Sequence, residues 1–175
     1  IDMTGEGSFY YVGLSTKNEY FGKTKVREAI LRHLIDFDGI NSTIMKYYGS
    51  YHQVPVQSGL SGTLENPGYK LDVAKGKALL AEAGYPDGRD ASSGQPLVLY
   101  LYTTDRGPGD KPRLDWYRKQ FAKLSLQLEI RGTDYNRFQE KVRKGAAQMF
   151  AWGWNADYPD PENFLFLFHS AQSRA

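Results

Sequence analysis

Hydrophobic positions along this chain follow the period of a strand in some stretches and that of a helix in others. The continuous apolar run 97–103 is typical of a central strand in a parallel sheet. Apolar residues then recur at helical spacing over 111–125, alternate as in a one-sided strand over 126–130, and return to helical spacing after Asp134. A last strand is predicted at 150–154. This order of elements is typical of a small mixed sheet with helical crossovers, so we predict an α/β fold.

The first half of the chain predicts one strand and three helices, with a long loop before the third. Residues 8–15 are rich in strand formers, and we expect them to be mostly buried. Thr24 is the predicted N-cap of the first helix, and a second, short helix is predicted over 38–45. Residues 50–71 lack periodicity and predict an ordered loop, followed by a helix over 72–83. The apolar anchors expected in the loop are Tyr51, Val54, Val56, Leu60 and Leu64.

A stretch near the C-terminus concentrates the candidate chemistry. The last strand places Trp152 and Trp154 on one face and runs out at Asn155, so Asp157 is expected just beyond the strand, beside an indole. A ring supplies cation–π attraction and a carboxylate supplies charge-assisted hydrogen bonds, which suits a cationic or amphipathic ligand. The residue types also fit a structural turn, with Trp154 in the core and Asp157 as a cap. Asp160 is expected to cap the helix that follows.

Clustered carboxylates also serve two other chemistries. A calcium loop needs more oxygen ligands at set positions and a fixed glycine, whereas prolines separate Asp157, Asp160 and Glu162, so a hard-cation site is not favoured. A carbohydrate-binding or glycoside-hydrolysing domain is the alternative function. Sugars stack on indoles such as Trp152 and Trp154, and a pair of acids such as Asp157 and Asp160 can cleave a glycosidic bond. The chain has no cysteine and its three histidines are isolated, so we assign no metal, cofactor or catalytic residue.

Three segments resemble signatures of the extracytoplasmic peptide-binding proteins of ABC importers, a family that includes oligopeptide-, dipeptide-, nickel- and sugar-binding members. Residues 153–164 are similar to its Gly-Trp-x-x-Asp-x-x-Asp/Glu-Pro-x-x-Phe signature. Residues 26–30, followed by Ile35 and Asp36, resemble its Val-Arg-x-Ala-Ile helix. Residues 72–85 resemble its Asp-x-x-Lys-Ala-x-x-Leu-Leu-x-Glu-Ala-Gly-Tyr helix. The three segments occur in the order of the family and together extend over most of the chain.

The resemblance implies a fold, a partner and a location. The chain would be one lobe, residues 1–175, on the C-terminal side of a two-lobed fold of the periplasmic-binding-protein type II kind. The whole protein would capture a peptide, or a related small solute, in the cleft between lobes and deliver it to a membrane permease. No catalysis is implied. The expected location is the periplasm, or the cell surface as a lipoprotein in a host with one membrane.

The resemblance also implies a binding site. In the family, the aspartate three residues after the tryptophan pairs with the α-ammonium of the peptide, and this role falls on Asp157. Trp154 would line the adjacent pocket, and Trp152 and Asn155 complete the predicted ligand-binding set. Some peptide-binding relatives place a basic residue three positions before the tryptophan, where this chain has Ala151. Long peptide, short peptide and a ligand that is not a peptide therefore all stay open.

Composition agrees with this interpretation and excludes some partners. A length of 175 residues suits one domain with its own core. The formal net charge of +2, with acids and bases interspersed, gives no basic face for nucleic acid, and no apolar run reaches membrane-spanning length. The start of the chain does not resemble a signal segment. We therefore expect a monomeric part of a longer protein.

Overall fold

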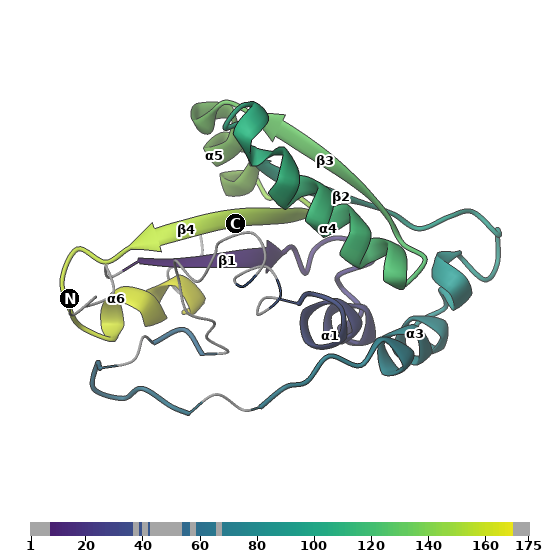
Figure 1. The fold of residues 1–175 in the computed structure, drawn as a ribbon, viewed down its shortest axis with the longest axis horizontal. Helices are drawn as coiled ribbons and strands as arrows, with labels where there is room; N and C mark the ends of the chain where they lie inside the picture. The colour runs from purple at the N-terminus through teal and green to yellow at the C-terminus, as the bar shows by residue number, and fades with distance from the viewer. Residues whose placement is uncertain are drawn as a thin grey trace.

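A four-stranded mixed sheet with helices on both faces forms the centre of the structure (Figure 1). This computed structural model describes residues 8–36, 39, 42, 54–56, 59–65 and 68–169. The described elements are β1 (Ser8–Leu14), α1 (Thr24–His33), α3 (Val73–Glu82), β2 (Val98–Thr104), α4 (Lys111–Lys123), β3 (Gln127–Thr133), α5 (Tyr135–Arg143), β4 (Met149–Asn155) and α6 (Glu162–Leu165), with 3-10 turns η1 (Pro86–Gly88), η2 (Pro108–Asp110) and η3 (Phe166–Phe168).

The strands lie in the order β1-β4-β2-β3. β2 pairs in parallel with β3 and β4, and α4 and α5 are the crossovers between these strands. β1 pairs antiparallel with β4, with Ser8 opposite Asn155 and Leu14 opposite Met149. The predicted α/β fold with a mixed sheet and helical crossovers is therefore confirmed, and the predicted central strand β2 has a neighbour on each side.

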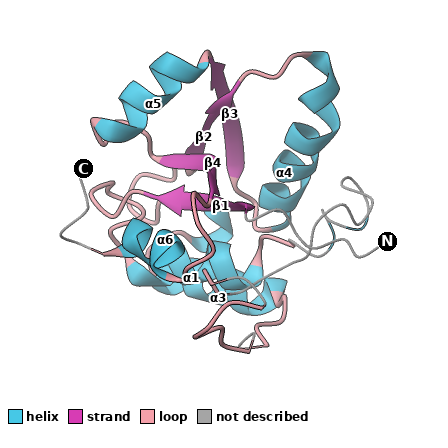
Figure 2. Ribbon diagram, turned by 90° about the vertical axis from the view of Figure 1, so that its left-hand side faces the viewer, coloured by secondary structure: helices cyan, strands magenta, loops and turns pink. Residues whose placement is uncertain are grey.

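The main core lies between one face of the sheet and the helices α1, α3 and α4. Figure 2 shows α4 and α5 on opposite sides of the sheet, with α1 and α3 packed below it. α1 and α3 approach closely at Gly76, where an added Cβ would lie 3.2 Å from the Cβ of His33. The fully buried side chains of this core include Phe21, Val26, Ile30, Leu34, Leu80, Leu99, Leu101, Phe121, Leu124 and Met149.

Aromatic side chains cover the opposite face of the β1–β4 pair. Phe138 of α5 packs edge-to-face on Trp152, with 5.2 Å between ring centroids. The contacts continue from ring to ring through the two strands as far as Phe164 of α6. We call this set the aromatic row, and its members in spatial order are Phe138, Trp152, Phe150, Tyr11, Phe9 and Phe164.

Two helices begin at the predicted N-caps. The carboxylate of Asp72 accepts a hydrogen bond from the backbone N–H of Lys75, and that of Asp134 accepts one from Arg137. The predicted cap Thr24 is wrong, because Lys23 occupies the cap position without a side-chain bond and Thr24 is the first helical residue. The hydroxyl of Thr24 instead accepts a hydrogen bond from a guanidinium of the next turn.

The structure differs from the sequence-based expectations in three further places. β1 is half-buried rather than mostly buried, because it is an edge strand, and Tyr10 on it is 69% exposed. β3 runs to Thr133, three residues beyond its predicted end, because its polar last residues still pair with β2. Leu64 is exposed and does not anchor the loop, whereas Val56 is buried. Most of the helix predicted over 38–45 lies outside the described residues. The predicted anchor Tyr51 lies outside them too, as does His52.

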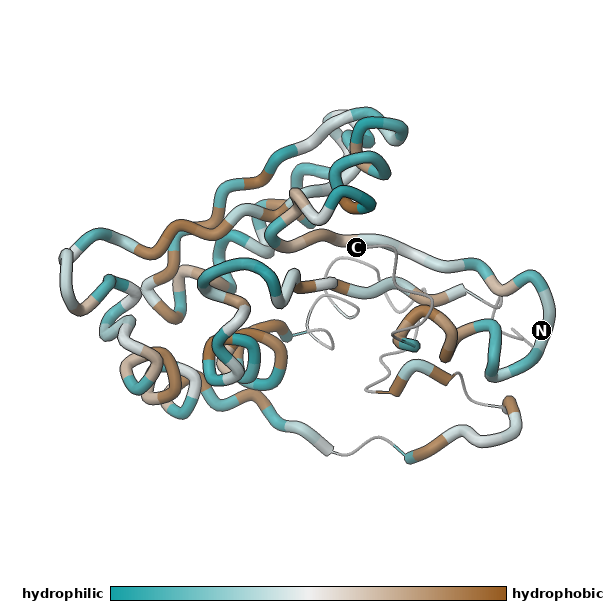
Figure 3. Tube along the Cα trace, turned by 180° about the vertical axis from the view of Figure 1, so that it is seen from behind, coloured by the Kyte–Doolittle hydropathy of each residue, from teal (hydrophilic) through white to brown (hydrophobic). Residues whose placement is uncertain are grey.

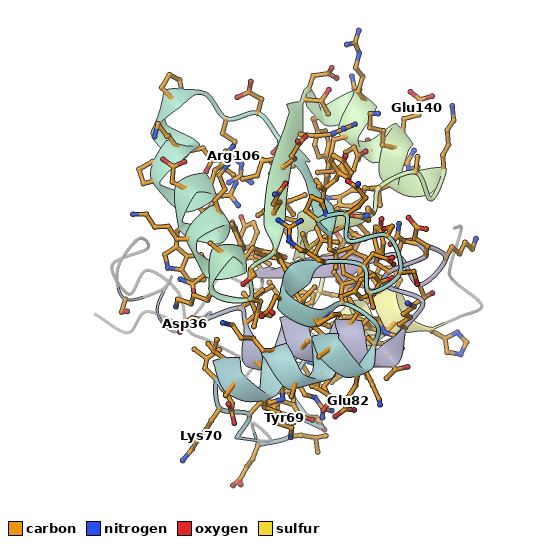
Figure 4. The ribbon with its side chains drawn as sticks, turned by 90° about the vertical axis from the view of Figure 1, so that its right-hand side faces the viewer. Asp36, Tyr69, Lys70, Glu82, Arg106 and Glu140 are labelled. Carbon is orange, nitrogen blue, oxygen red and sulfur yellow. The ribbon has the colours of Figure 1, made fainter. Side chains whose placement is uncertain are left out.

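Charged and polar side chains dominate the outer helix α5. Figure 3 shows α5 as a mostly hydrophilic helix, whereas hydrophobic residues concentrate in the strands and inner helices. Glu82 and Glu140 lie at the periphery of the molecule (Figure 4), where they pair with Lys25 and Lys144 while staying more than half exposed. Exposed pairs of this kind contribute little to stability. Among the helices that the structure describes, none is both long and apolar enough to cross a lipid bilayer.

Candidate functional site

The stretch singled out from sequence lies where β4 ends and turns into α6. The strand ends at Asn155, as predicted, and Asn155 is exposed opposite Ser8 at the edge of the β1–β4 pair. The following loop is kept out of helix until α6 begins at Glu162, directly after Pro161. Six residues separate the two elements, and Asp157 lies within them.

The side chain of Asn163 ties this loop to the strand. Asn163 is 3% exposed, and its Oδ1 accepts a hydrogen bond from the indole Nε1 of Trp154 at 2.9 Å. The same oxygen accepts the backbone N–H of Asp157 at 3.1 Å. One buried amide therefore fixes a strand residue and a loop residue relative to each other, although they lie nine and six positions away in sequence.

The two tryptophans of the predicted site have different surroundings. Trp154 is half-buried and packs edge-to-face against Phe166, with 5.0 Å between ring centroids. Trp152 is half-buried within the aromatic row, against Phe138 and Phe150. Trp154 is therefore the indole that belongs to the same hydrogen-bonded unit as Asp157, whereas Trp152 lies two residues further back along the strand and packs under α5.

Asp157 is exposed and its carboxylate takes no part in the turn. Among the residues that the structure describes, this carboxylate has no hydrogen-bond or ion-pair partner, whereas the backbone N–H of the same residue is bound by Asn163. The interpretation of Asp157 as a turn cap needs its side chain to accept such a bond, and Asn163 performs that role instead. The acid is held by its backbone and presents a free carboxylate.

The two other acids of the cluster are engaged within the loop and helix. Asp160 accepts the backbone N–H of Glu162, the first residue of α6, at 2.8 Å. Its side chain therefore bonds at the start of the helix as expected, but the cap position itself is occupied by Pro161, one residue later than predicted. Glu162 accepts the hydroxyl of Tyr158 at 2.8 Å. A two-carboxylate hydrolysis would need a second acid beside Asp157 that is free to move a proton. In the described ranges, no three His, Asp or Glu side chains gather as a metal site would require.

Arg27 and His33, both on α1, serve the packing of the fold. Arg27 donates from its guanidinium to the carbonyls of Phe21, at 2.6 Å, and Gly22, which ties the preceding loop to α1. His33 is buried between α1 and α3. A surface depression of about 420 Å³ lies on α5, lined by that helix's own residues, and shares none with the Trp154–Asn163 unit. The predicted ligand-binding residues at the end of β4 therefore lie apart from this depression.

Sequence reasoning did not identify Asn163. It lies inside the matched signature. The two groups that donate hydrogen bonds to it are an indole on β4 and a backbone N–H in the loop, and the spacing of residues in a helix or a strand does not predict that these groups come together. The available signal was an amide directly before the apolar run 164–168, since a polar side chain that is buried with such a run needs hydrogen-bond partners.

Comparison with known proteins identifies the family. A family model described as "Bacterial extracellular solute-binding proteins, family 5 Middle" matches residues 3–175. The chain therefore belongs to the bacterial extracellular solute-binding proteins of family 5. These are solute-binding proteins, and the resemblance drawn from the three sequence segments is confirmed.

Individual relatives carry several ligand names. The chain is 27% identical over 157 residues to heme-binding protein A of Haemophilus influenzae. This match covers 89% of the chain and 28% of the relative. It is also 27% identical over 176 residues to the oligopeptide-binding protein AppA of Bacillus subtilis. This match covers 94% of the chain and 32% of AppA.

A solved structure shows the same fold. The chain superposes with a TM-score of 0.77 on the ABC transporter-associated periplasmic binding protein DppA of Helicobacter pylori, which was solved with the peptide STSA. The two are 24% identical, and the match covers 90% of this chain and 29% of DppA. The chain thus spans roughly a third, or less, of the length of the relatives that it matches.

Proposed function

We propose that this chain, residues 1–175, is the C-terminal-side lobe of a longer two-lobed protein that captures peptides for an ABC importer. Capture takes place outside the cytoplasmic membrane, in the periplasm or on a lipid anchor at the cell surface, and the loaded protein delivers the peptide to a membrane permease. Family membership and the oligopeptide-binding relative AppA support this class of function. The protein performs no chemical step on its ligand and needs no cofactor.

The free carboxylate of Asp157, held by its backbone beside Trp154, is the observation that carries the proposal. A carboxylate is an acceptor for the α-ammonium of a peptide, and an ion-to-ion hydrogen bond is roughly twice as strong as a neutral one. Trp154 supplies an apolar wall and a ring face for the adjoining part of the ligand. Trp152 and Asn155, on the same strand, stay in the predicted ligand-binding set.

Closure of the two lobes strengthens this ion pair. The Asp157 carboxylate is exposed in the lobe alone, where water weakens its attraction for a cation. A second lobe that covers it excludes water and lowers the effective dielectric constant, while backbone groups of the peptide pair with strand edges. Affinity and closure therefore depend on the same contact.

The test is Asp157→Asn in the full-length protein, with a free-amine peptide and its N-acetylated form as ligands. Removing one partner of a buried charge pair costs about 2–5 kcal/mol, hence roughly thirtyfold to several-thousandfold in affinity. Calorimetry should show this loss for the free-amine peptide, while the melting temperature stays close to that of wild type because the carboxylate has no hydrogen-bond or ion-pair partner among the described residues. Acetylation should weaken wild type far more than the variant.

Asp160→Asn is the matched control, because it removes an equal negative charge only three residues after Asp157. The carboxylate of Asp160 accepts the first backbone N–H of α6 and is not part of the proposed ammonium site. It should leave the affinity for the free-amine peptide near the wild-type value. Equal binding of acetylated and free-amine peptides by wild type would remove the ammonium site and with it the main support for a peptide ligand.

A further inference from the structure

Asn163 holds the geometry on which the proposed ammonium site depends. We infer that Asn163 is a positioning residue for peptide binding, which fixes the backbone of Asp157 against Trp154 so that the carboxylate is presented in one place. This inference rests on the proposed function and adds to it a residue that is buried beneath the site rather than exposed to the ligand.

The hydrogen bonds define the orientation of the amide. The indole Nε1 of Trp154 and the backbone nitrogen of Asp157 are both donors, and both point at the same atom of Asn163, at 2.9 and 3.1 Å. An atom that receives two donors is the amide oxygen, with its two lone pairs, and not the amide nitrogen. With the residue 3% exposed, water does not compete for these bonds freely.

Within the part of the chain that the structure describes, no other hydrogen bond holds the backbone N–H of Asp157. The first backbone hydrogen bonds of the loop that follow Asp157 run from Asp160 to Tyr158 and from Asn163 to Asp160. The backbone N–H of Asp157 itself is satisfied by the side chain of Asn163. On the strand side, the same oxygen fixes the indole edge of Trp154, and Phe166 packs on its ring.

Loss of the amide oxygen therefore frees the residue that carries the ammonium acceptor. A freed backbone residue must be ordered again when the ligand binds, which costs roughly five- to thirtyfold in affinity. This cost falls on ligands that use the Asp157 carboxylate, namely those with a free ammonium. It does not fall equally on acetylated ligands, which do not pair with the carboxylate.

The experiment measures dissociation constants of trialanine and N-acetyl-trialanine for the full-length protein and for Asn163→Leu. In wild type, trialanine should bind at least ~30-fold more tightly than its acetylated form. In Asn163→Leu, which keeps the branching and the number of heavy side-chain atoms and removes both acceptor contacts, this ratio should fall by about tenfold. Asn163→Asp keeps an oxygen acceptor at the same place and should hold the ratio above that of Asn163→Leu.

Phe164→Leu is the matched control for stability. Phe164 is the next residue of α6, fully buried against Phe9, and its truncation loosens the same helix without touching either hydrogen bond. It should lower the melting temperature and leave the ratio unchanged. NMR supplies a direct readout, because Asn163→Leu should shift the indole N–H signal of Trp154 and speed hydrogen exchange at the amide of Asp157, whereas Phe164→Leu should do neither.

A double variant separates positioning from a general loss of shape. If Asn163 acts through Asp157, the variant Asn163→Leu, Asp157→Asn should bind trialanine no more weakly than Asp157→Asn alone. The inference is overturned if Asn163→Leu lowers stability and keeps the wild-type ratio, or if the two losses of affinity add. A ratio of one in wild type is a different result, since it removes the ammonium site itself and the proposed function with it.

Discussion

Asp110 and Arg113 form the most shielded ion pair among those described, with side chains 12% and 19% exposed. The guanidinium donates through Nε to one carboxylate oxygen at 2.7 Å and through a terminal nitrogen to the other at 2.6 Å. These hydrogen bonds lower the pKa of the Asp110 carboxyl below its ordinary value and raise the pKa of Arg113, although burial opposes both shifts. A bidentate pair with this little exposure holds the start of α4 to the turn before it.

Replacing Asp110 by Asn should destabilise the protein in a pH-dependent way. The lowered pKa in the folded state means that this carboxylate contributes stability above its unfolded pKa of about 3.9, and that the contribution is lost as pH falls through the folded pKa. At pH 7 we expect Asp110→Asn to lose about 1.5–3 kcal/mol, the range of a charged hydrogen bond. Urea unfolding at pH 7 and at pH 3 should show this difference shrinking at the lower pH.

Asp115→Asn is the control for this prediction. The pKa of Asp115 is also lowered, first by a hydrogen bond from Lys111, but Asp115 lies on the outer side of α4 and its partners are exposed. Water screens such a pair, so this substitution should change the free energy of unfolding far less. Equal losses for the two variants at pH 7 would show that burial of the Asp110 pair has no energetic consequence.

Single residues also show what the sequence alone could and could not predict. Asp72 and Asp134 were predictable as caps, because each bonds to a backbone N–H three residues later and the whole interaction lies within one turn. Thr24 carries the same local signal and fails, because its hydroxyl is used by Arg27, whose other bonds reach back to the preceding loop. Asn163 gave no such signal, since its partners meet it only after β4 and α6 have packed.

Two glycines on the β1–β4 pair each lie beneath an aromatic ring of the other strand, on opposite faces. An added Cβ at Gly13 would lie 2.3 Å from the ring of Phe150, and one at Gly153 would lie 2.7 Å from the ring of Tyr10. Phe150 is packed within the aromatic row between Tyr11 and Trp152, whereas Tyr10 is 69% exposed. The two glycines therefore make similar close contacts with a ring, but the ring of Tyr10 is free to move and the ring of Phe150 is not.

This difference predicts unequal effects of the same substitution. Gly13→Ala forces a packed ring to shift, and overpacking of this kind costs about 1–3 kcal/mol. Gly153→Ala only displaces an exposed ring, so its effect on the free energy of unfolding should stay within about 0.5 kcal/mol. Chemical denaturation of the two variants checks this order, and a larger loss for Gly153→Ala would contradict the packing described for Phe150.

Elements were predictable where pattern and environment agree. β2 is apolar on both faces and lies inside the sheet, so its run of hydrophobic residues gave its type and its central place. β1 has a similar composition, yet the whole strand lies at an edge of the sheet. Composition alone does not reveal which strand has only one neighbour. The end of β3 was missed for the opposite reason, because pairing with β2 continues through Arg131 and Gly132, which have no strand-like pattern.

At the scale of the whole molecule, the chain has its own core but only part of the proposed ligand site. The core between the sheet and α1, α3 and α4 should let these 175 residues fold and unfold cooperatively. Without a second lobe, Asp157 stays in water, so we expect weak or undetectable peptide binding by this chain alone. Calorimetry with a free-amine peptide checks this, and micromolar or tighter binding would contradict the proposal that the site is completed by another lobe.

The pairing of Ser8 with Asn155 has a mechanical consequence. These two residues lie opposite each other at the same end of the β1–β4 ladder, and the ladder runs from there to Leu14 and Met149. A force that pulls Ser8 and Asn155 apart therefore acts across the strands and loads their hydrogen bonds one pair at a time, as in a zipper. The same force applied along the strands would load all the pairs together, so the β1–β4 pair resists a pull across its strands at this end less than a pull along them.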